Sequence, residues 1–179
     1  MPGRGDRRPS EAVSSHSRSE AQAGPKPDAG TALAVAYAYL NTRERTVAEV
    51  RRKLSDAGVD PDAAAAAIAE LHEQGYLDDA RFARLFAQDK RQLEGWGNER
   101  IEVALRRHGI DHELIAGTLA DGSGGELDRA LEVLRRRFPI PPRTRRDRDR
   151  ALGVILRKGY DSELALEALA IHARESPAA

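Results

Sequence analysis

The chain of 179 residues contains no cysteine, and aromatic residues make up only 4% of it. The absence of cysteine excludes disulfide bonds and thiolate metal ligands, and it fits a protein of the reducing cytosol. No apolar run approaches the roughly 20 residues that span a membrane. The N-terminus has charges but no apolar segment of the kind that a secretory signal contains. We therefore expect a cytoplasmic protein without a membrane partner.

The sequence also lacks the signatures of common enzymes. No phosphate-binding glycine loop ends in Lys-Ser or Lys-Thr, and the glycine-rich segment 122–125 follows no strand. No serine or threonine lies in a recognisable motif with a histidine and an acid. His108 and His112 have the spacing of a metal pair on one helix, but Gly109 and Asp111 break that helix between them. We expect no catalytic activity, no cofactor and no metal.

Net charge is zero, with 29 basic and 29 acidic residues, but the charges are unevenly distributed. Residues 135–150 contain eight arginines and only two aspartates. This segment either contacts a polyanion or an acidic protein face, or it is a solvated loop and helix start laced with ion pairs. Residues 1–30 are rich in Gly, Pro, Ser, Arg and Ala, which predicts a disordered tail.

A short phrase occurs three times in the chain. Its copies are centred on Gly58, Gly109 and Gly159, which are 51 and 50 positions apart. In each copy an apolar residue lies four positions before the glycine, an apolar or aromatic residue follows it, and an aspartate comes next. Glycine just past a helix adopts the left-handed conformation, and an aspartate two residues later caps the next helix. Recurrence at this period predicts a tandem array of one helical unit.

Apolar residues around each glycine recur at helical spacing, which predicts two helices per unit. A third helix precedes each pair, and Thr46-Val-Ala-Glu49 is a capping box that starts the second helix of the first unit. No stretch shows the alternation of a strand between hairpin turns. We therefore predict an all-α protein that forms an elongated, slightly curved body. Its three tandem three-helix repeats are expected over residues 31–77, 78–121 and 122–175.

The most specific sequence motif lies in the middle of the chain. It reads Gly75-Tyr-Leu-Asp-Asp-Ala-Arg-Phe-Ala83, then a basic pair, then Gly95-Trp-Gly-Asn-Glu-Arg-Ile101. This wording resembles the RecX family of bacterial recombination regulators, whose hallmark is "Gly-Tyr-Leu-Asp-Asp-x-Arg-Phe-Ala", a basic helix and "Gly-x-x-x-Ile-x-x-x-Leu-x-x-x-Gly-Ile". The resemblance extends over roughly residues 31–173.

The resemblance implies both a fold and a function. Proteins similar to RecX are all-helical and are built from three three-helix repeats. They bind the RecA recombinase, lie along the groove of its filament on DNA, and inhibit its ATPase, strand-exchange and co-protease activities. Some also bind DNA directly. We accordingly expect a monomeric, non-enzymatic regulator of DNA repair and the SOS response, with RecA as its main partner and DNA as a secondary one.

The candidate contacts with RecA or DNA are basic residues and one tryptophan. Charges near a helix C-terminus also stabilise the helix itself, so a structural role is at least equally open for Lys90 and for Arg91 alone. Trp96 lies between two glycines and is either a plug at a junction or an anchor for a partner. The candidates are Lys90, Arg91, Trp96, Arg100, Arg106, Arg107, Arg143, Arg145 and Arg146.

Residues of the hallmark motif are expected to have structural roles. Asp78 and Asp79 are predicted helix caps, and Arg81 is predicted to pair with a nearby acid. Phe82 is predicted to belong to the core. We expect Tyr76 to pack where two repeats meet, with its hydroxyl at the rim. Gly58, Gly109 and Gly159 are the predicted helix stops.

The main rival interpretation is a DNA-binding transcription regulator, because two helices joined by a glycine turn resemble a helix-turn-helix. That function expects Arg, Asn, Gln or Ser on the exposed face of the recognition helix. The helices after Gly58 and Gly109 are instead rich in alanine and acids, such as Asp62 and Glu113. A purely structural scaffold is a third alternative that the residues leave open.

Overall fold

A computed structural model of the protein describes residues 28–122 and 124–175. The tail predicted for residues 1–30 lies outside this part except for its last three residues. Within the described residues the chain forms nine α-helices and no strand, which confirms the all-α prediction. The helices are α1 (Ala29–Leu40), α2 (Val47–Asp56), α3 (Pro61–Glu73), α4 (Asp79–Glu94), α5 (Asn98–Arg107), α6 (His112–Asp121), α7 (Glu126–Arg137), α8 (Arg145–Arg157) and α9 (Ser162–Arg174).

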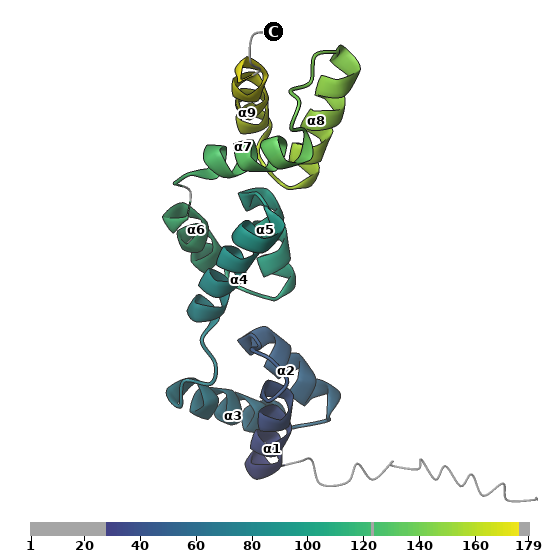
Figure 1. Ribbon diagram of the computed structural model, residues 1–179. Coiled ribbons are helices and arrows are strands. Elements are labelled where there is room, and N and C mark those ends of the chain that lie inside the picture. Colours follow the sequence, from purple (N-terminus) through teal and green to yellow (C-terminus); the bar gives the residue numbers. More distant parts are fainter. Residues whose placement is uncertain (1–27, 123, 176–179) are drawn as a thin grey trace, which may run out of the picture.

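The helices form three groups of three, stacked one above another in an elongated body (Figure 1). Each group has an apolar core of its own. Leu54 lies in the first core, Ile101 and Leu105 lie in the second, and Leu134 and Ile155 lie in the third. Because each core is small, we expect the stability of a repeat to depend on its neighbours as well.

Side-chain caps start the helices where the sequence predicts them. Thr46 and Glu49 form the predicted capping box, with N–H···O distances of 3.2 Å in both directions. Asp60, Asp111 and Asp161 each accept a hydrogen bond from the backbone amide two residues further on, at 2.8–3.0 Å. These bonds satisfy amides that a helix start leaves free, so the repeated phrase does join one helix end directly to the next helix start.

Two of the three glycines of the repeated phrase, Gly109 and Gly159, also lie at the junctions between repeats. Gly58, Gly109 and Gly159 have φ angles of 72°, 79° and 83°, in the left-handed region. A Cβ atom on Gly109 would lie 2.3 Å from the Cβ of Ala48, and one on Gly159 would lie 2.3 Å from the Cβ of Arg100. The C-terminal end of α5 therefore rests on the N-terminal end of α2, and the same end of α8 rests on α5. A Cβ on Gly58, in the first repeat, would meet no atom within 4 Å.

Polar contacts join the first repeat to the second. The Thr46 hydroxyl donates to the carbonyl oxygen of His108 at 2.6 Å, and the backbone amide of Val47 donates to the Asp79 carboxylate at 3.0 Å. Asp78 caps its own helix by accepting from the amide of Arg81. Asp79 is thus a cap as predicted, but for α2 of the preceding repeat rather than for the helix that it begins. Burial raises the pKa of this carboxyl.

The other residues of the hallmark motif lie close to the same junction. Arg81 forms an ion pair with Glu44 at 3.0 Å, across the two repeats. Phe82 is buried and stacks on Phe86 in the second core. The Tyr76 side chain is 54% exposed, and its ring meets the ring of Tyr37 edge-on within the first repeat. Tyr76 was expected where two repeats meet, but this contact forms inside one repeat, because Tyr76 lies three residues after the end of α3 and its ring contacts α1.

Replacing Thr46 by valine is expected to destabilise the protein by about 2–3 kcal/mol. The substitution removes a helix cap and also leaves the partly buried His108 carbonyl without the hydroxyl that now donates to it. The control is Thr144→Val, which removes the cap of α8 but no contact between repeats, and should cost about 1 kcal/mol. Urea unfolding measures both values. Equal losses would show that the contact with His108 adds nothing.

Candidate functional site

The junction between the second and third repeats is formed by direct backbone contact. The amide of Gly97 donates to the Lys158 carbonyl at 2.8 Å, and the amide of Glu99 donates to the Gly159 carbonyl at 3.1 Å. A Cβ atom on Gly97 would lie only 2.2 Å from the oxygen of Gly159. The free amides at the start of α5 thereby satisfy the free carbonyls at the end of α8. This contact fixes α5 and α8 relative to each other, so side chains from both repeats share one surface.

A basic cleft of about 660 Å³ opens beside this junction, between α5, α7 and α8. Five of its seven lining residues are basic and none is acidic. The side chains of Arg136, Arg137 and Arg157 are exposed, and none of the three has an acidic partner among the described residues. Such a concentration of unpaired positive charge is suited to a polyanion or to an acidic protein surface. The cleft is lined by Arg100, Val133, Arg136, Arg137, Val154, Arg157 and Lys158.

Trp96 lies at the edge of the same junction with a cation on its ring. The guanidinium of Arg100 lies 4.0 Å from the ring centroid, and the ammonium of Lys90 lies 4.9 Å from it. The Lys90 ammonium also forms an ion pair with Glu94 one turn further along α4. Trp96 is half-buried against the core of the second repeat. These contacts lie within the second repeat, and the exposed side of Trp96 lines a groove that residues of the third repeat also border.

This groove is smaller than the cleft, with a volume of about 420 Å³, and it runs between α5 and the end of α8. Val103 and Leu156 contribute exposed apolar surface to it, and their side chains are 48% and 41% exposed. Arg100 and Arg157 line both the groove and the basic cleft, so the two form one continuous surface. The groove is lined by Trp96, Glu99, Arg100, Val103, Ala104, Arg107, Leu156, Arg157 and Gly159.

Arg91, one of the predicted contact residues, points into the junction instead. Its guanidinium donates to the Asn98 side-chain oxygen at 2.9 Å, and Asn98 in turn donates to the Glu126 carboxylate at 2.6 Å. Burial lowers the pKa of Arg91, and the nearby charge of Arg129 acts in the same direction. A Cβ atom on Gly122 would overlap the Arg91 guanidinium. Arg91 therefore joins α4 to α5 and α7, and a change here disturbs the fold before it disturbs any partner.

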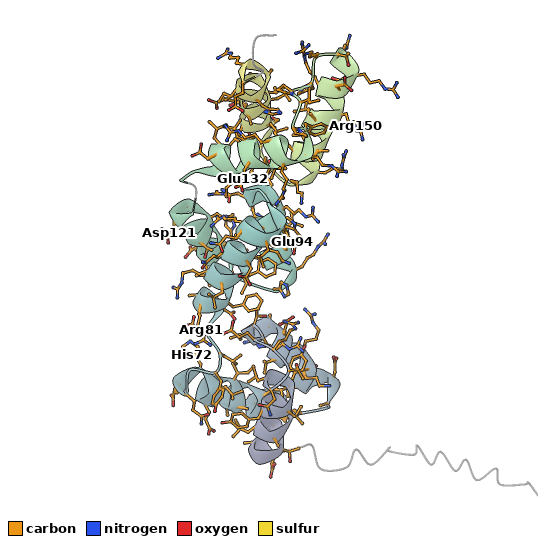
Figure 2. All side chains as sticks on the ribbon, viewed as in Figure 1. His72, Arg81, Glu94, Asp121, Glu132 and Arg150 are labelled. Atoms are coloured by element: carbon orange, nitrogen blue, oxygen red, sulfur yellow. The ribbon has the colours of Figure 1, made fainter. Side chains whose placement is uncertain are left out.

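The other predicted contacts fall into two places. Arg107 lines the groove, whereas its neighbour Arg106 pairs with Glu102 on the same helix. Arg145 and Arg146 begin α8, and Arg143 precedes it. The rise along α8 places Arg145 about 18 Å from Arg157, so these three lie toward the other end of the helix. In Figure 2, Arg150 marks α8 in the third repeat and Glu94 marks the end of α4 in the second.

Arg136, Arg137 and Arg157 were missing from the predicted contact set. Arg136 and Arg137 belong to the arginine-rich segment 135–150, but nothing in its sequence distinguishes them from Arg143 and Arg145 as contact residues. Arg157 lies two positions before Gly159, as Arg107 lies two positions before Gly109. Extending the repeat register to basic residues would therefore have found Arg157 from the sequence.

Tyr160, the aromatic residue of the third phrase, is fully buried, and its hydroxyl has no hydrogen-bond partner in the described structure. Burial raises the pKa of Tyr160 to about 12. We expect Tyr160→Phe to leave stability unchanged or to raise it by up to about 1 kcal/mol near neutral pH, because an unsatisfied hydroxyl is removed. Urea unfolding measures the effect. A loss above about 1 kcal/mol would show that the hydroxyl has a partner, such as a buried water.

The same residue gives stability a dependence on alkaline pH. Between about pH 10 and pH 12 the unfolded chain releases the Tyr160 proton while the folded chain keeps it, so the free energy of unfolding falls as pH rises. Tyr160→Phe lacks this contribution. Its stability should therefore fall less steeply than that of the wild type over the same pH range.

The fold and the junction define a class of protein: an elongated helical repeat protein with a basic cleft beside one of its junctions. Among the described residues, no group of three or more His, Cys, Asp or Glu side chains is placed to hold a metal ion. None of the described helices is long and apolar enough to cross a membrane.

Comparisons with known proteins identify the family. The model of the first three-helix domain of RecX matches residues 32–71, and that of the second three-helix domain matches residues 78–119. Regulatory protein RecX of Stenotrophomonas maltophilia (strain R551-3) is 34% identical over 139 residues, which cover 77% of this chain and 85% of that protein. Regulatory protein RecX of Mycobacterium sp. (strain JLS) is 32% identical over 165 residues, covering 86% and 90%. The chain belongs to the RecX family of regulatory proteins.

A solved structure supports the same fold. The crystal structure of RecX from Lactobacillus salivarius matches with a TM-score of 0.72 at 19% sequence identity. The match covers 81% of this chain and 96% of that chain. The likeness in fold therefore extends over the stacked helical body and beyond the two domains that the family models match.

Proposed function

We propose that the protein binds RecA nucleoprotein filaments and inhibits their ATPase, strand-exchange and co-protease activities, without being an enzyme itself. It would thereby modulate DNA repair and the SOS response in the cytoplasm. The observation that carries this proposal is membership of the RecX family of regulatory proteins over most of the chain. The three stacked repeats and the basic junction supply a physical mechanism.

An elongated body is suited to contact several neighbouring protomers of a helical filament. Each repeat has its own core, and the three lie one above another (Figure 1). Weak contacts that are linked in one chain gain strongly through effective concentration. A molecule that bridges protomers would restrict the motions that ATP turnover and subunit exchange require.

The chemistry of the surface favours a protein as the first partner and DNA as the second. Net charge is zero, whereas a protein devoted to DNA binding is usually strongly basic. Several arginines outside the cleft have acidic partners within the chain, such as Arg43 with Glu49 and Arg135 with Glu175. The unpaired arginines of the cleft would meet acidic side chains of the partner or nearby phosphates of its DNA.

The helix-turn-helix alternative gains no support from the helices that follow the glycine turns. Asp62, Glu70 and Glu73 of α3 are exposed, as is Glu113 of α6. A recognition helix of this composition would present negative charge to the phosphates that border the major groove. We therefore regard these helices as parts of repeats rather than as readers of base sequence.

The test of the proposal is RecA ATPase on single-stranded DNA, titrated with the purified protein. We expect inhibition at well below one molecule per RecA monomer, because one bridging molecule acts on several protomers. Inhibition only near a full equivalent would contradict bridging but keep RecA as the partner. Unchanged ATPase at a molar excess, with no cosedimentation of the protein with filaments, would refute the proposed function.

A further inference from the structure

The groove between α5 and α8 combines two kinds of surface that rarely lie together on a protein without a partner. Val103 of α5 and Leu156 of α8 come from different repeats and are both substantially exposed within it. They share the groove because the backbone contact between Gly97 and Lys158 fixes the two helices. Exposed apolar side chains that gather in a concave surface mark a site of interaction.

Positive charge surrounds this apolar floor. Arg107 and Arg157 line the groove, and neither has an acidic partner among the described residues. The neighbouring Arg106 is different, because it pairs with Glu102 on its own helix. The groove continues through Arg157 into the basic cleft, where Arg136 adds further charge. An occupant of the whole surface would contact apolar side chains in the groove and guanidinium groups from there into the cleft.

These features favour a protein segment over a nucleic acid as the occupant of the groove. A phosphate backbone gains nothing from Val103 and Leu156. A nucleic-acid base would need an open aromatic face to stack on, but the guanidinium of Arg100 lies 4.0 Å from the ring centroid of Trp96. A protein segment can instead supply large apolar side chains for Val103 and Leu156 and carboxylates for Arg107 and Arg157.

We propose that the groove binds a segment of the partner protein in which large apolar residues are flanked by aspartate or glutamate. This proposal rests on the proposed function, because it specifies the chemistry by which the partner is recognised. The apolar side chains of the segment would cover Val103 and Leu156, and its carboxylates would pair with Arg107 and Arg157. The acidic stretch would continue toward the cleft and Arg136.

The first experiment separates apolar recognition from charge. Val103→Ser together with Leu156→Ser removes the apolar floor and leaves every charge in place. We expect this double variant to bind RecA filaments at least 10-fold more weakly in cosedimentation, while its affinity for a single-stranded oligo(dT) changes less than twofold. Matched controls are Ile140→Ser with Leu166→Ser, two apolar residues that are more exposed and lie outside the groove. Equal filament binding by the groove variant and the control would overturn the proposal.

The second experiment identifies what occupies the groove. Because the chain has no cysteine, Leu156→Cys offers one attachment point for a benzophenone maleimide, with Leu166→Cys as the control. On RecA filaments the probe at position 156 should cross-link to a RecA segment that contains apolar and acidic residues. Cross-links that go to the DNA, or to a RecA segment without acidic residues, would overturn the proposal.

A third measurement keeps failure of this inference distinct from failure of the proposed function. Trp96 is the only tryptophan in the chain and lines the groove, so its emission reports on occupancy. A synthetic peptide with two leucines flanked by glutamates should shift this emission. The shift should be absent when serine replaces leucine in the peptide, and also in the Val103→Ser, Leu156→Ser protein.

If the wild type does not bind RecA but responds to the peptide, the groove assignment holds and the partner is another protein. If it binds RecA and neither the peptide nor the groove variant has an effect, the groove assignment fails and the proposed function remains.

Discussion

Gly97→Ala is expected to undock the third repeat from the second and to lower the free energy of unfolding by about 3 kcal/mol, near the upper end of overpacking effects. The added Cβ would lie 2.2, 2.4 and 2.5 Å from the Gly159 oxygen, the Gly159 carbon and the Tyr160 nitrogen. All three are backbone atoms, which cannot move aside as the end of a flexible side chain does. Gly97 has a φ of −81°, which any residue adopts, so the effect would come from the contact alone.

Hydrogen exchange locates the loss. The amides of position 97 and of Glu99 donate across this junction, so their protection should fall in the variant while that of the core helices remains. Urea unfolding should become broader, because repeats that no longer touch unfold more independently. The control is Gly117→Ala in α6, where a Cβ meets nothing within 4 Å. It should raise stability by up to about 1 kcal/mol. An unchanged midpoint and unchanged exchange for Gly97→Ala would show that the junction is not closed in solution.

The helices could be predicted from the sequence because their signals are local. A capping box spans only four residues, and Thr46 with Glu49 forms it as predicted. A glycine followed two positions later by an aspartate closes one helix and starts the next within a few residues, whatever surrounds them. The same pattern occurs three times at a spacing of about 50 residues, so it predicts three similar helical units. The fold class could therefore be predicted from Gly58, Gly109 and Gly159.

Contacts between repeats could not be predicted because they depend on how distant segments approach. Asp79 has the position of a cap for α4, yet its carboxylate accepts from Val47, 32 residues earlier. Arg91 resembles an exposed cation at a helix end, and only the position of Asn98 and Gly122 shows that it is enclosed. Sequence spacing also hides that Arg157 and Arg100 share one surface, since they lie 57 residues apart.

Because contacts between distant segments could not be predicted, the candidate site residues were chosen from local features of the sequence alone. Trp96 was singled out because it lies between two glycines, and the structure shows why both are there: Gly95 is the left-handed end of α4 and Gly97 allows contact with the third repeat. The arginine run looked uniform along the sequence. In three dimensions α8 separates its members, so that Arg136 lies at the cleft and Arg145 at the far end of the helix.

The two groups of arginines can be separated by reversing their charge. Changing Arg136, Arg137 and Arg157 together to glutamate should raise the concentration needed for half-maximal inhibition of RecA ATPase by 30-fold or more. Like charges placed opposite each other at an interface cost several kcal/mol, and about 2 kcal/mol already corresponds to roughly 30-fold. Because glutamates near the end of α7 also oppose its dipole, thermal unfolding is measured alongside. The corresponding glutamine variant, which removes charge without reversing it, should show a smaller loss in the same direction.

The matched control is glutamate at Arg143, Arg145 and Arg146, the group at the other end of α8. Both triple variants lower the net charge, which is zero in the wild type, by the same amount. A general repulsion from a negatively charged filament would therefore weaken both equally, whereas contact through the cleft predicts a change of less than about threefold for the control. Equal losses would leave only long-range attraction as the role of these arginines. A larger loss for the variant at Arg143, Arg145 and Arg146 would place the contact surface at the start of α8. The cleft would then be a consequence of how the repeats pack and not a binding site.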